Sequence, residues 1–360
     1  MKGLVLYPDG HYSLDEVPEP RLGAGRYAPH DVLIEVAYCG ICGSDVHGWH
    51  VAEGTRLAGP AKAVVGGHEM VGTVRAVGPA VTRVKPGDRV VGEIVTNYCG
   101  ECVNCRAGRI NICVNTPPKE GRIHYTEGGA FAPWVAWRDS ALHILPDNVT
   151  SEEAVLMEAT AGSVHCLYER LELRAGESVA ILGPGARGQI LLQLALAAGA
   201  RPVLVSGIQR DARIRLPLAK ETGADRVVNI DQEDLIAAAK ELTGGQGFDV
   251  VVENAGVASA VEQAIEIARP GGRIMISGGG IRGGVTIPLH TWPVIVKELT
   301  LYGEISHNWT SWKTAVAMAA RGQINLKPLL TRVYPLSQWE QGFSDAAMGD
   351  DVMRVALRPE

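Results

Sequence analysis

The amino-acid sequence predicts an α/β protein in which a doubly wound parallel sheet is joined to a second, β-rich module. Two observations carry this prediction. Short β-branched runs fill the first third of the chain, and strand-like and helix-like segments alternate from about residue 150 onward. At about 150 residues per domain, a chain of 360 residues has room for both modules.

The β-rich module begins with runs of residues that are typical of short strands. Such runs occupy residues 32–36, 71–74 and 89–91, and the turn sequence Lys-Pro-Gly-Asp at 85–88 separates two of them. β-branched side chains pack well on a pleated surface, whereas Pro and Gly favour turns. We therefore expect an all-β module in this part of the chain.

The alternating segment is expected to begin with a helix, because Thr150 and Glu153 are spaced as a capping box before an apolar-periodic stretch. Helical patterns and strand patterns then follow one another, which is the order of a parallel sheet with helices on both faces. The predicted strands are residues 178–182, 202–206, 226–230, 249–253 and 273–277, and the clearest helical patterns are 189–198 and 231–242.

The domain bounds follow from these segments. The dinucleotide-binding type of sheet is expected at residues 155–292. Two further helical patterns, at 312–320 and 337–348, are expected to return to the β-rich module. That module would then comprise residues 1–154 and 293–360.

Composition and charge exclude several classes of protein. With 46% hydrophobic and 21% charged residues, the chain resembles neither a disordered protein nor a coiled coil. The 34 Lys and Arg residues against 40 Asp and Glu give a net charge of -6, which excludes a bulk positive field for nucleic acid or anionic lipid. No apolar stretch reaches the roughly 20 residues of a membrane span. The first residues lack the features of a signal peptide, so we expect no membrane anchor and a cytoplasmic location.

Four of the seven cysteines are spaced as metal ligands. Cys99, Cys102, Cys105 and Cys113 follow the pattern C-x2-C-x2-C-x7-C, so that a loop at about residues 97–115 places four thiolates around one tetrahedral ion with no open position. We interpret this loop as a structural zinc site. Four reduced thiols without a metal are one alternative. An iron–sulfur cluster is disfavoured because the fourth cysteine lies far beyond the three-residue gap of bacterial ferredoxins.

A second group of metal-capable residues comprises Cys39, Cys42, His47, His68 and Glu69. Cys39 and Cys42 form a C-x-x-C pair, which raises a redox alternative, but that motif belongs beside a β-α-β unit and here lies in the β-rich module. A lone His68 is also more often a core residue than a ligand. From these residue types alone, the group is a candidate metal site.

The sequence Gly-Pro-Gly-Ala-Arg-Gly at residues 183–188 predicts a dinucleotide-binding turn. It matches G-x-G-x-x-G between a predicted strand and a Pro-free helical pattern. In that context the glycines allow a tight turn and let a pyrophosphate approach the helix N-terminus. A glycine-rich turn without a ligand is the alternative. The candidate cofactor-binding residues of the turn are Gly183, Gly185, Ala186, Arg187 and Gly188.

The end of the second predicted strand bears on the choice between NAD and NADP. The acidic residue expected about 20 residues beyond the glycine turn is absent. Gly207 closes the strand instead, and Arg210 follows. An acid would bind the ribose 2′-hydroxyl and repel a 2′-phosphate, so Gly207 with Arg210 nearby favours NADP. The alternative is that Arg210 is a solvated surface charge beside Asp211.

Four motifs in this order resemble the zinc-dependent alcohol and polyol dehydrogenases of the medium-chain dehydrogenase/reductase superfamily, over nearly the whole chain. They are Cys-Gly-Ser-Asp-Val-His at 42–47, Gly-His-Glu at 67–69, the four-cysteine loop and the glycine turn. Leu-Pro-Asp-Asn-Val-Thr at 145–150, leading into Leu-Met-Glu at 156–158, is similar to the sorbitol dehydrogenase branch. The resemblance implies a chaperonin-10-like β domain, a Rossmann domain, and a cleft between them holding catalytic zinc and nicotinamide.

The resemblance also implies roles for individual residues. Cys42 and His68 would be the first two ligands of the catalytic zinc, and Glu158 stands where the polyol branch has a carboxylate ligand. Glu69 would bind the metal directly or through water. Cys166 is expected to be a small core residue.

Ser44 and His47 match the proton relay of the family. The chain departs from the family at two places: Gly207 replaces the usual acid of NAD-dependent members, and Ala-Thr-Ala at 159–161 replaces the proline that commonly follows the glutamate ligand. Trp49 is a candidate pocket wall or a packing residue. Lys297 and Glu298 form either a pair near the nicotinamide or a solvated ion pair.

The function implied by the resemblance is the zinc-dependent, reversible oxidation of a secondary alcohol or polyol to a ketone, with hydride transfer to NADP or NAD. One alternative is a zinc-ribbon binding module fused to a nucleotide-sensing Rossmann domain. A second alternative is a zinc-free quinone or enoyl reductase of the same superfamily. The expected partners are a small alcohol, polyol or ketone and further copies of the chain, in a homotetramer or homodimer.

Overall fold

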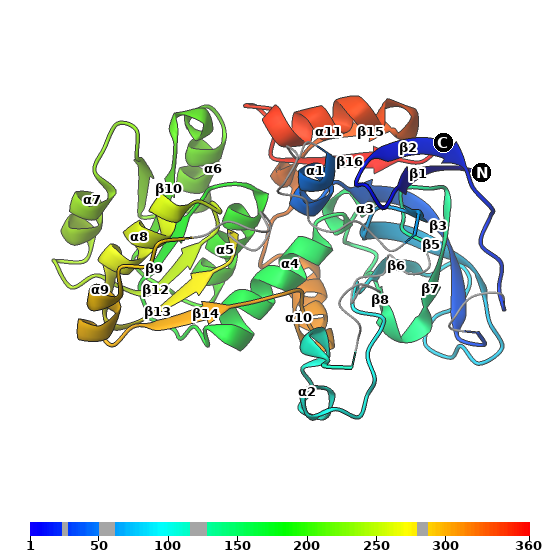
Figure 1. Ribbon diagram of the computed structural model, residues 1–360, viewed down its shortest axis with the longest axis horizontal. Helices are drawn as coiled ribbons and strands as arrows, with labels where there is room; N and C mark the ends of the chain where they lie inside the picture. The colour runs from blue at the N-terminus through cyan, green and yellow to red at the C-terminus, as the bar shows by residue number, and fades with distance from the viewer. Residues whose placement is uncertain (24–27, 50–61, 116–127, 279–286) are drawn as a thin grey trace. The chain divides into compact units, whose positions relative to one another are not determined.

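A computed structural model describes residues 1–23, 28–49, 62–115, 128–278 and 287–360, and of residues 47 and 48 it describes the backbone alone. The described residues form two compact units (Figure 1). The first unit comprises Met1–Gly162, Ile305–Gly322 and Leu326–Glu360, and the second comprises Ser163–Glu304 and Gln323–Asn325. The domain bounds given above stay a prediction.

The first unit is built on β-sheet. Among its described residues, one seven-stranded sheet has the order β15-β16-β3-β5-β6-β8 with β7 paired to β3, and a three-stranded sheet has the order β2-β1-β4. The strands are β1 Lys2–Leu6, β2 Tyr12–Glu16, β3 Asp31–Gly40, β4 Val64–Val65, β5 Glu69–Val77, β6 Arg89–Gly92, β7 Trp134–Arg138, β8 Leu142–Ile144, β15 Leu330–Pro335 and β16 Arg354–Arg358. The three runs predicted as strands lie within β3, β5 and β6.

The register of β3 against β5 brings two candidate ligand segments together. The two strands are antiparallel and pair from Val32 opposite Val77 to Gly40 opposite Glu69. Cys42 lies two residues after Gly40, the last residue of β3, and His68 directly precedes β5. Sheet pairing alone therefore places these segments at one end of the strands.

The helices of the first unit lie after strands or cover its core. They are α1 Gly43–Trp49, α2 Val103–Arg106, α3 Ser151–Ala154, α4 Met157–Val164, α10 Trp309–Ala320 and α11 Trp339–Met348. The capping box predicted at Thr150 and Glu153 is confirmed at the start of α3. α4 runs on into a π-helical turn at His165–Arg170. Phe343 of α11 is fully buried and packs in one core with Phe131 and Trp137.

The second unit contains a six-stranded sheet of the order β11-β10-β9-β12-β13-β14, in which every pairing is parallel. Its strands are β9 Val179–Leu182, β10 Val203–Gly207, β11 Arg226–Asn229, β12 Phe248–Glu253, β13 Ala268–Ile276 and β14 Thr300–Gly303. Its helices are α5 Ala186–Ala197, α6 Arg215–Thr222, α7 Leu235–Leu242, α8 Ala258–Ile267 and α9 Thr291–Val296. The order reverses between β9 and β12. Dinucleotides bind at such a switch point in doubly wound sheets.

The predicted alternation of strands and helices is confirmed, since each of the five predicted strands overlaps one of β9–β13 and the two helical patterns overlap α5 and α7. α5 contacts α6, and α7 contacts α8. Right-handed crossovers place these two pairs on opposite faces of the sheet. β14, at the edge of the sheet, was not predicted from the sequence.

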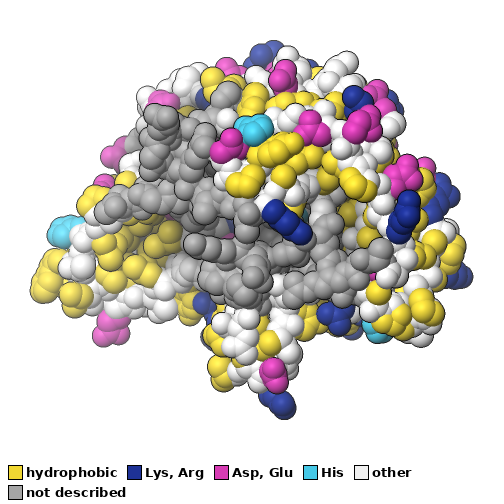
Figure 2. Space-filling model, turned by 45° about the vertical axis from the view of Figure 1, so that its right-hand side comes forward, with side chains coloured by type: hydrophobic (Ala, Val, Ile, Leu, Met, Phe, Trp, Pro, Cys, Tyr) yellow, Lys and Arg dark blue, Asp and Glu magenta, His cyan; other side chains and the backbone are white. Residues whose placement is uncertain are grey.

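Charges of opposite sign are intermingled on the described part of one face of the molecule (Figure 2). On the described part of the face drawn in Figure 2, acidic and basic side chains are scattered among apolar ones. This agrees with the small net charge of -6. None of the helices in the described segments is long and apolar enough to cross a membrane.

Candidate active site

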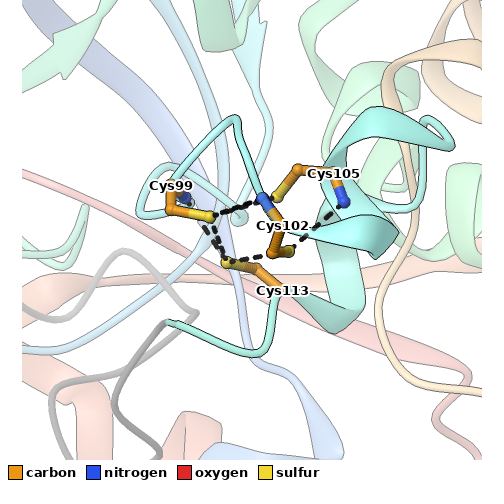
Figure 3. A group of neighbouring side chains, drawn as sticks. All are labelled: Cys99, Cys102, Cys105 and Cys113. Atoms are coloured by element: carbon orange, nitrogen blue, oxygen red, sulfur yellow. Dashed lines mark hydrogen bonds between the residues drawn. The ribbon is translucent and has the colours of Figure 1, made fainter.

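The four cysteines of the predicted zinc loop converge in the first unit (Figure 3). The Sγ atom of Cys99 lies 4.0 Å from that of Cys105 and 3.6 Å from that of Cys113, and the Sγ atoms of Cys102 and Cys113 are 4.0 Å apart. Four sulfurs at the usual Zn–S distance from one ion form a tetrahedron with edges of about 3.8 Å. The thiols therefore fit a structural zinc ion.

Backbone groups of the loop support thiolates at these positions. The N–H groups of Cys99, Cys102 and Cys105 donate to the sulfurs of Cys113, Cys99 and Cys102 at 3.4, 3.3 and 3.5 Å. The backbone N–H of Cys105 lowers the pKa of the Cys102 thiol, whereas burial raises the pKa of Cys105 to about 12. Asn111 fixes the end of the loop, because its Nδ2 donates to the carbonyl oxygen of Ile305 at 2.8 Å.

Cys42, His68 and Glu69 form a second group of possible metal ligands in the same unit. One ligand atom of each lies within 4.8 Å of the other two. Zinc accepts thiolate, imidazole and carboxylate donors, and three protein ligands leave a position open, as in catalytic zinc sites. This donor set therefore fits a catalytic zinc ion.

Glu69 has a carboxylate oxygen that lacks a partner. Glu69 is 1% exposed, and Nη2 of Arg354 donates to its Oε1 at 2.8 Å, whereas Oε2 accepts no hydrogen bond from any residue that the structure describes. Burial raises the pKa of Glu69 to about 7, although Arg354 acts in the opposite direction. The space beside Oε2 depends on Gly40, since a Cβ there would lie 2.2 Å from Oε2. A cation at Oε2 would satisfy a buried acceptor that is costly to leave unpaired.

Asp45 holds the segment that carries Cys42. Its Oδ2 accepts a hydrogen bond from the backbone N–H of Cys42 at 2.9 Å, and its Oδ1 accepts one from the hydroxyl of Tyr12 at 3.2 Å. Oδ1 also lies 3.9 Å from Nδ1 of His68. Burial lowers the pKa of His68, but the negative charges of Asp45 and Cys42 outweigh it and hold that pKa well above its usual value. Asp45 thus connects two of the candidate ligands.

Glu158 lies in the first turn of α4, outside the group of three donors. Its Oε1 is 3.1 Å from Nε2 of His307. Burial alone would raise the pKa of Glu158, but the hydrogen bond with His307 and the nearby positive charges, among them Arg354, together outweigh burial and bring the pKa to about 2. The negative charge of Glu158 in turn raises the pKa of His68 and of Glu69. The negative charge of the Glu158 carboxylate therefore contributes to the electrostatics of the Cys42, His68 and Glu69 group.

The remaining two cysteines are core residues. Cys39 and Cys166 are both fully buried, and burial raises the pKa of each thiol well above its usual value. A redox-active cysteine needs an accessible thiolate. The structure therefore speaks against the redox alternative for Cys39 and Cys42.

The glycine turn of the second unit has the geometry of a dinucleotide site. Gly183 has a φ of 111°, which favours glycine. A Cβ at Gly188 would lie 2.1 Å from the carbonyl oxygen of Gly183, so glycine is required where α5 packs against the turn. Within the described segments, no atom lies within 4 Å of the Cβ position of Gly185. This open side lies at the N-terminus of α5, where a pyrophosphate would meet backbone N–H groups. Ala186 is the first residue of that helix.

Arg187 of the turn is engaged with side chains from other strand ends of the sheet. Its Nη1 donates to Oδ1 of Asn254 at 3.3 Å and to the hydroxyl of Ser277, and its Nη2 donates to Oε1 of Glu304. The Ser277 hydroxyl donates to the same Glu304 oxygen at 2.7 Å. This arginine therefore connects the turn after β9 with the ends of β12, β13 and β14.

Gly207 ends β10 beside the turn, and Arg210 lies in a short 3-10 helix after it. A Cβ at Gly207 would lie 2.7 Å from Oδ2 of Asp211 and 2.7 Å from Cγ of Pro184. Asp211 is buried and pairs with Arg215 at 2.8 Å. The side chains around position 207 thus leave no space for the acid that the family usually carries there.

The structure places the other predicted residues as follows. Ser44 lies in α1, two residues after Cys42, whereas the side chain of His47 lies outside the described part of the chain. Trp49 packs edge-on against Trp339 and Phe343, with ring centroids 5.9 and 5.7 Å apart, so it is a packing residue.

Lys297 fits neither interpretation made from the sequence. Its Nζ donates to the carbonyl oxygens of Ile265, Glu266 and Ala268 at 2.9, 2.8 and 3.2 Å. These carbonyls lie at the C-terminus of α8, where a cation is favourable. Lys297 is therefore a cap of α8.

Sequence reasoning missed two residues that contact candidate ligands. Arg354 pairs with Glu69 and His307 with Glu158, across 285 and 149 positions of sequence. Neither lies in a motif. Asp45 was read only as a member of its motif, although an acidic residue at the third position of a helix commonly accepts a hydrogen bond from the N-cap backbone N–H, here that of Cys42.

Comparisons with known proteins identify the family of the chain. The family described as "Alcohol dehydrogenase GroES-like domain" matches residues 28–147, and the family described as "Zinc-binding dehydrogenase" matches residues 187–321. The chain is 35% identical to a D-arabitol-phosphate dehydrogenase of Enterococcus avium, over 100% of this chain and 98% of the relative. It is 32% identical to a sorbitol dehydrogenase of Halalkalibacterium halodurans, over 100% and 99%.

Solved structures show the same fold. A zinc-binding dehydrogenase of Sinorhizobium meliloti 1021, bound to NADP, superposes with a TM-score of 0.85 at 30% identity, covering 99% of each chain. 2R,3R-butanediol dehydrogenase of Bacillus subtilis superposes with a TM-score of 0.83 at 26% identity, covering 100% of this chain and 99% of the other. The chain belongs to the zinc-dependent alcohol and polyol dehydrogenases of the medium-chain dehydrogenase/reductase superfamily, oxidoreductases that convert secondary alcohols or polyols reversibly to ketones with a nicotinamide cofactor.

Proposed function

We propose that Cys42, His68 and Glu69 hold the catalytic zinc ion of this dehydrogenase, with Glu158 as a further carboxylate at the same site. The observation that carries the proposal is the convergence of three different donors within 4.8 Å. The unpartnered, buried Oε2 of Glu69 supports it. A bound zinc ion supplies Lewis acidity, which brings the pKa of a coordinated hydroxyl group toward neutrality.

Protein residues then have to remove the hydroxyl proton of the substrate. Ser44, two residues after Cys42 in α1, is proposed to accept this proton and to pass it toward His47. General-base relays of this kind contribute about 10²–10⁴-fold to a rate. A Ser44→Ala variant should lose most of this factor and keep its zinc; unchanged kinetics near neutral pH would exclude the relay.

Cys99, Cys102, Cys105 and Cys113 are proposed to hold a second, structural zinc ion. Four thiolates leave no open position, so this ion would serve folding and not catalysis. The test of both metal proposals is the zinc content per chain. We expect about two ions in the wild type and about one in Cys42→Ser, with the fold retained and turnover abolished. A fully active Cys42→Ser variant would refute the assignment.

For the cofactor we propose NADP as the preferred nicotinamide. Gly183, Gly185, Ala186, Arg187 and Gly188 form the turn for its pyrophosphate. The crowded Gly207 position supports the proposal, because no acid stands there to repel a 2′-phosphate. The dehydrogenase of Sinorhizobium meliloti 1021 was solved with NADP bound.

Arg210 is the proposed contact of the 2′-phosphate. An Arg210→Ala variant should lose kcat/KM with NADP by at least about tenfold and keep it with NAD. Arg321→Ala, an exposed arginine of the first unit, is the matched control. An Arg210→Ala enzyme that keeps its full NADP preference would refute this role.

As substrate we propose a polyol or a phosphorylated or unphosphorylated sugar alcohol with a secondary hydroxyl. Relatives named D-arabitol-phosphate dehydrogenase and sorbitol dehydrogenase support this class. A panel of polyols, their phosphates and simple secondary alcohols, assayed with both cofactors by the absorbance of the reduced nicotinamide, tests it. Turnover of simple alcohols alone would contradict the polyol assignment.

We also propose that the enzyme acts in the cytoplasm as a homo-oligomer, a tetramer or a dimer. Four closely spaced thiols that must stay reduced to bind zinc support a reducing compartment. Light scattering of the purified enzyme tests the assembly, and a monomeric mass at working concentration would contradict it.

A further inference from the structure

A line of buried polar and aromatic side chains leads away from Glu158 within the first unit. Nε2 of His307 lies 3.1 Å from Oε1 of Glu158, and Nε1 of Trp312 donates to Nδ1 of His307 at 2.7 Å. His143 stacks on Trp312 and is itself 2.7 Å from Oε1 of Glu93. His307 and Trp312 are both 0% exposed. The line thus joins α4, the start of α10, β8 and the end of β6.

The bond from Trp312 determines the tautomer of His307. An indole nitrogen only donates hydrogen bonds, so Nδ1 of His307 has to carry a lone pair. A neutral imidazole with an acceptor at Nδ1 carries its proton on Nε2. Nε2–H therefore donates to Oε1 of Glu158. One oxygen of this carboxylate is committed to His307, and only Oε2 remains for another partner.

Trp312 is itself held in place. Its ring centroid lies 5.4 Å from that of His143 with an interplanar angle of 7°, and 5.1 Å from that of His307 with an angle of 89°. Glu93 is 2% exposed and fixes His143 from the other side. The indole cannot turn its N–H away from His307 without breaking the stack.

The backbone also holds His307 in one position. The residue before it, Ser306, has a φ of 56°, in the left-handed region that non-glycine residues rarely adopt. The residue after it, Asn308, caps α10 by accepting from Ser311 and donating its backbone N–H to the Ser311 hydroxyl at 2.9 Å. A strained conformation of this kind persists where the surroundings determine it, and such residues cluster at functional sites.

We propose that His307, held in one tautomer by Trp312, is a positioning residue that orients Glu158 toward the catalytic zinc ion. The inference rests on the proposed function, because it assigns the open oxygen of Glu158 to that site. His307 lies in none of the sequence motifs, and it contacts the Glu158 carboxylate and not the metal. Partners of ligand side chains affect metal affinity without touching the metal.

The test compares two substitutions of His307. His307→Gln keeps an acceptor for Trp312 and a donor for Glu158, whereas His307→Leu keeps the volume and removes both. We expect His307→Leu to weaken zinc binding at the catalytic site by about 10–100-fold. His307→Gln should stay close to wild type. Zinc affinity is measured on the full chain by competition with a chelator.

Two controls separate positioning from general damage to the core. His165→Gln changes a buried histidine of the second unit that pairs with Glu169 at 2.6 Å, and it should leave zinc affinity unchanged. Trp312→Phe keeps the stack and removes the N–H, so it should weaken zinc binding less than His307→Leu. In the cobalt-substituted enzyme, the visible absorption band should shift in His307→Leu and not in His307→Gln.

The outcomes distinguish this inference from the proposed function. Wild-type zinc affinity in His307→Leu, or equal losses in His307→Leu and His307→Gln, would overturn the positioning role while Cys42→Ser still loses one zinc ion. If Cys42→Ser keeps both ions, the catalytic site itself is wrong. Should His307→Leu fail to fold, wild-type affinity in Trp312→Phe would overturn the role.

Discussion

The buried pair of Arg354 and Glu69 leads to a prediction whose size follows from the structure. Glu69 is 1% exposed, and the pair is joined by a bond of 2.8 Å. At this distance and an effective dielectric constant near 20, the attraction is about 6 kcal/mol. Well above the Glu69 pKa of about 7, removing Arg354 costs about 3–5 kcal/mol, because the Glu69 carboxylate is then buried, charged and uncompensated.

The perturbation is Arg354→Met, which keeps much of the side-chain length and removes the charge. At roughly 2.1 cal/mol/K per residue for a chain of 360 residues, the loss corresponds to a fall in Tm of about 4–7 °C. Arg358→Met, on an exposed position of the same strand, should change Tm little. Differential scanning calorimetry on the zinc-free and the zinc-loaded protein measures the change.

Two further results test the reasoning behind this number. Adding Glu69→Gln to Arg354→Met removes the uncompensated charge and should restore much of the lost stability. Zinc should also lessen the effect of Arg354→Met, since the ion supplies a positive charge near Glu69. A loss below about 1 kcal/mol in the zinc-free protein, or no recovery in the double variant, would refute the account of Glu69 as a buried carboxylate that depends on Arg354.

Three other changes have expected outcomes. In the metal-free site the pKa of His68 lies well above its usual value, so zinc has to displace the proton of the His68 imidazolium. Zinc affinity, measured by competition with a chelator, should therefore rise as the pH increases from 6 to 8. An affinity that does not change with pH would contradict His68 as a zinc ligand. Cys105→Ser should remove the structural ion and lower Tm, as metal analysis and calorimetry will show; an unchanged zinc content would argue against a four-thiolate site. Gly207→Asp should lower the free energy of unfolding by roughly 1–3 kcal/mol and lower kcat/KM with NADP, because a Cβ at position 207 would lie 2.7 Å from side-chain atoms of Asp211 and Pro184. A stable variant that prefers NAD would show that position 207 has space for an acidic side chain.

The parts of the fold that sequence predicts well are those with a local cause. The strands β9–β13 are short apolar runs between turn residues, and the glycines at 183 and 188 are required by a φ of 111° and by a contact of 2.1 Å at their own turn. The four-cysteine loop closes within 15 residues of chain, so its spacing alone determines that the thiols meet.

The parts that sequence does not predict depend on contacts between distant segments. Arg354 lies in the last strand of the first unit and pairs with Glu69 only because β16 lies next to β3 in the sheet. His307 stands outside any periodic pattern, and its partner Glu158 precedes it by 149 positions. Lys297 looks like half of an ion pair in the sequence because Glu298 follows it, yet its three partners are backbone carbonyls, which no sequence pattern shows.

Arg187, within the glycine turn, affects how well the turn is ordered before the nucleotide binds. Arg187 ties the turn to Asn254, Ser277 and Glu304, so the crossover between the two halves of the sheet is braced from within. Such a brace keeps the backbone N–H groups of the turn in place before any nucleotide arrives. Nucleotide binding therefore has to order little additional backbone at this turn, because the conformational entropy of the turn is already lost when the protein folds.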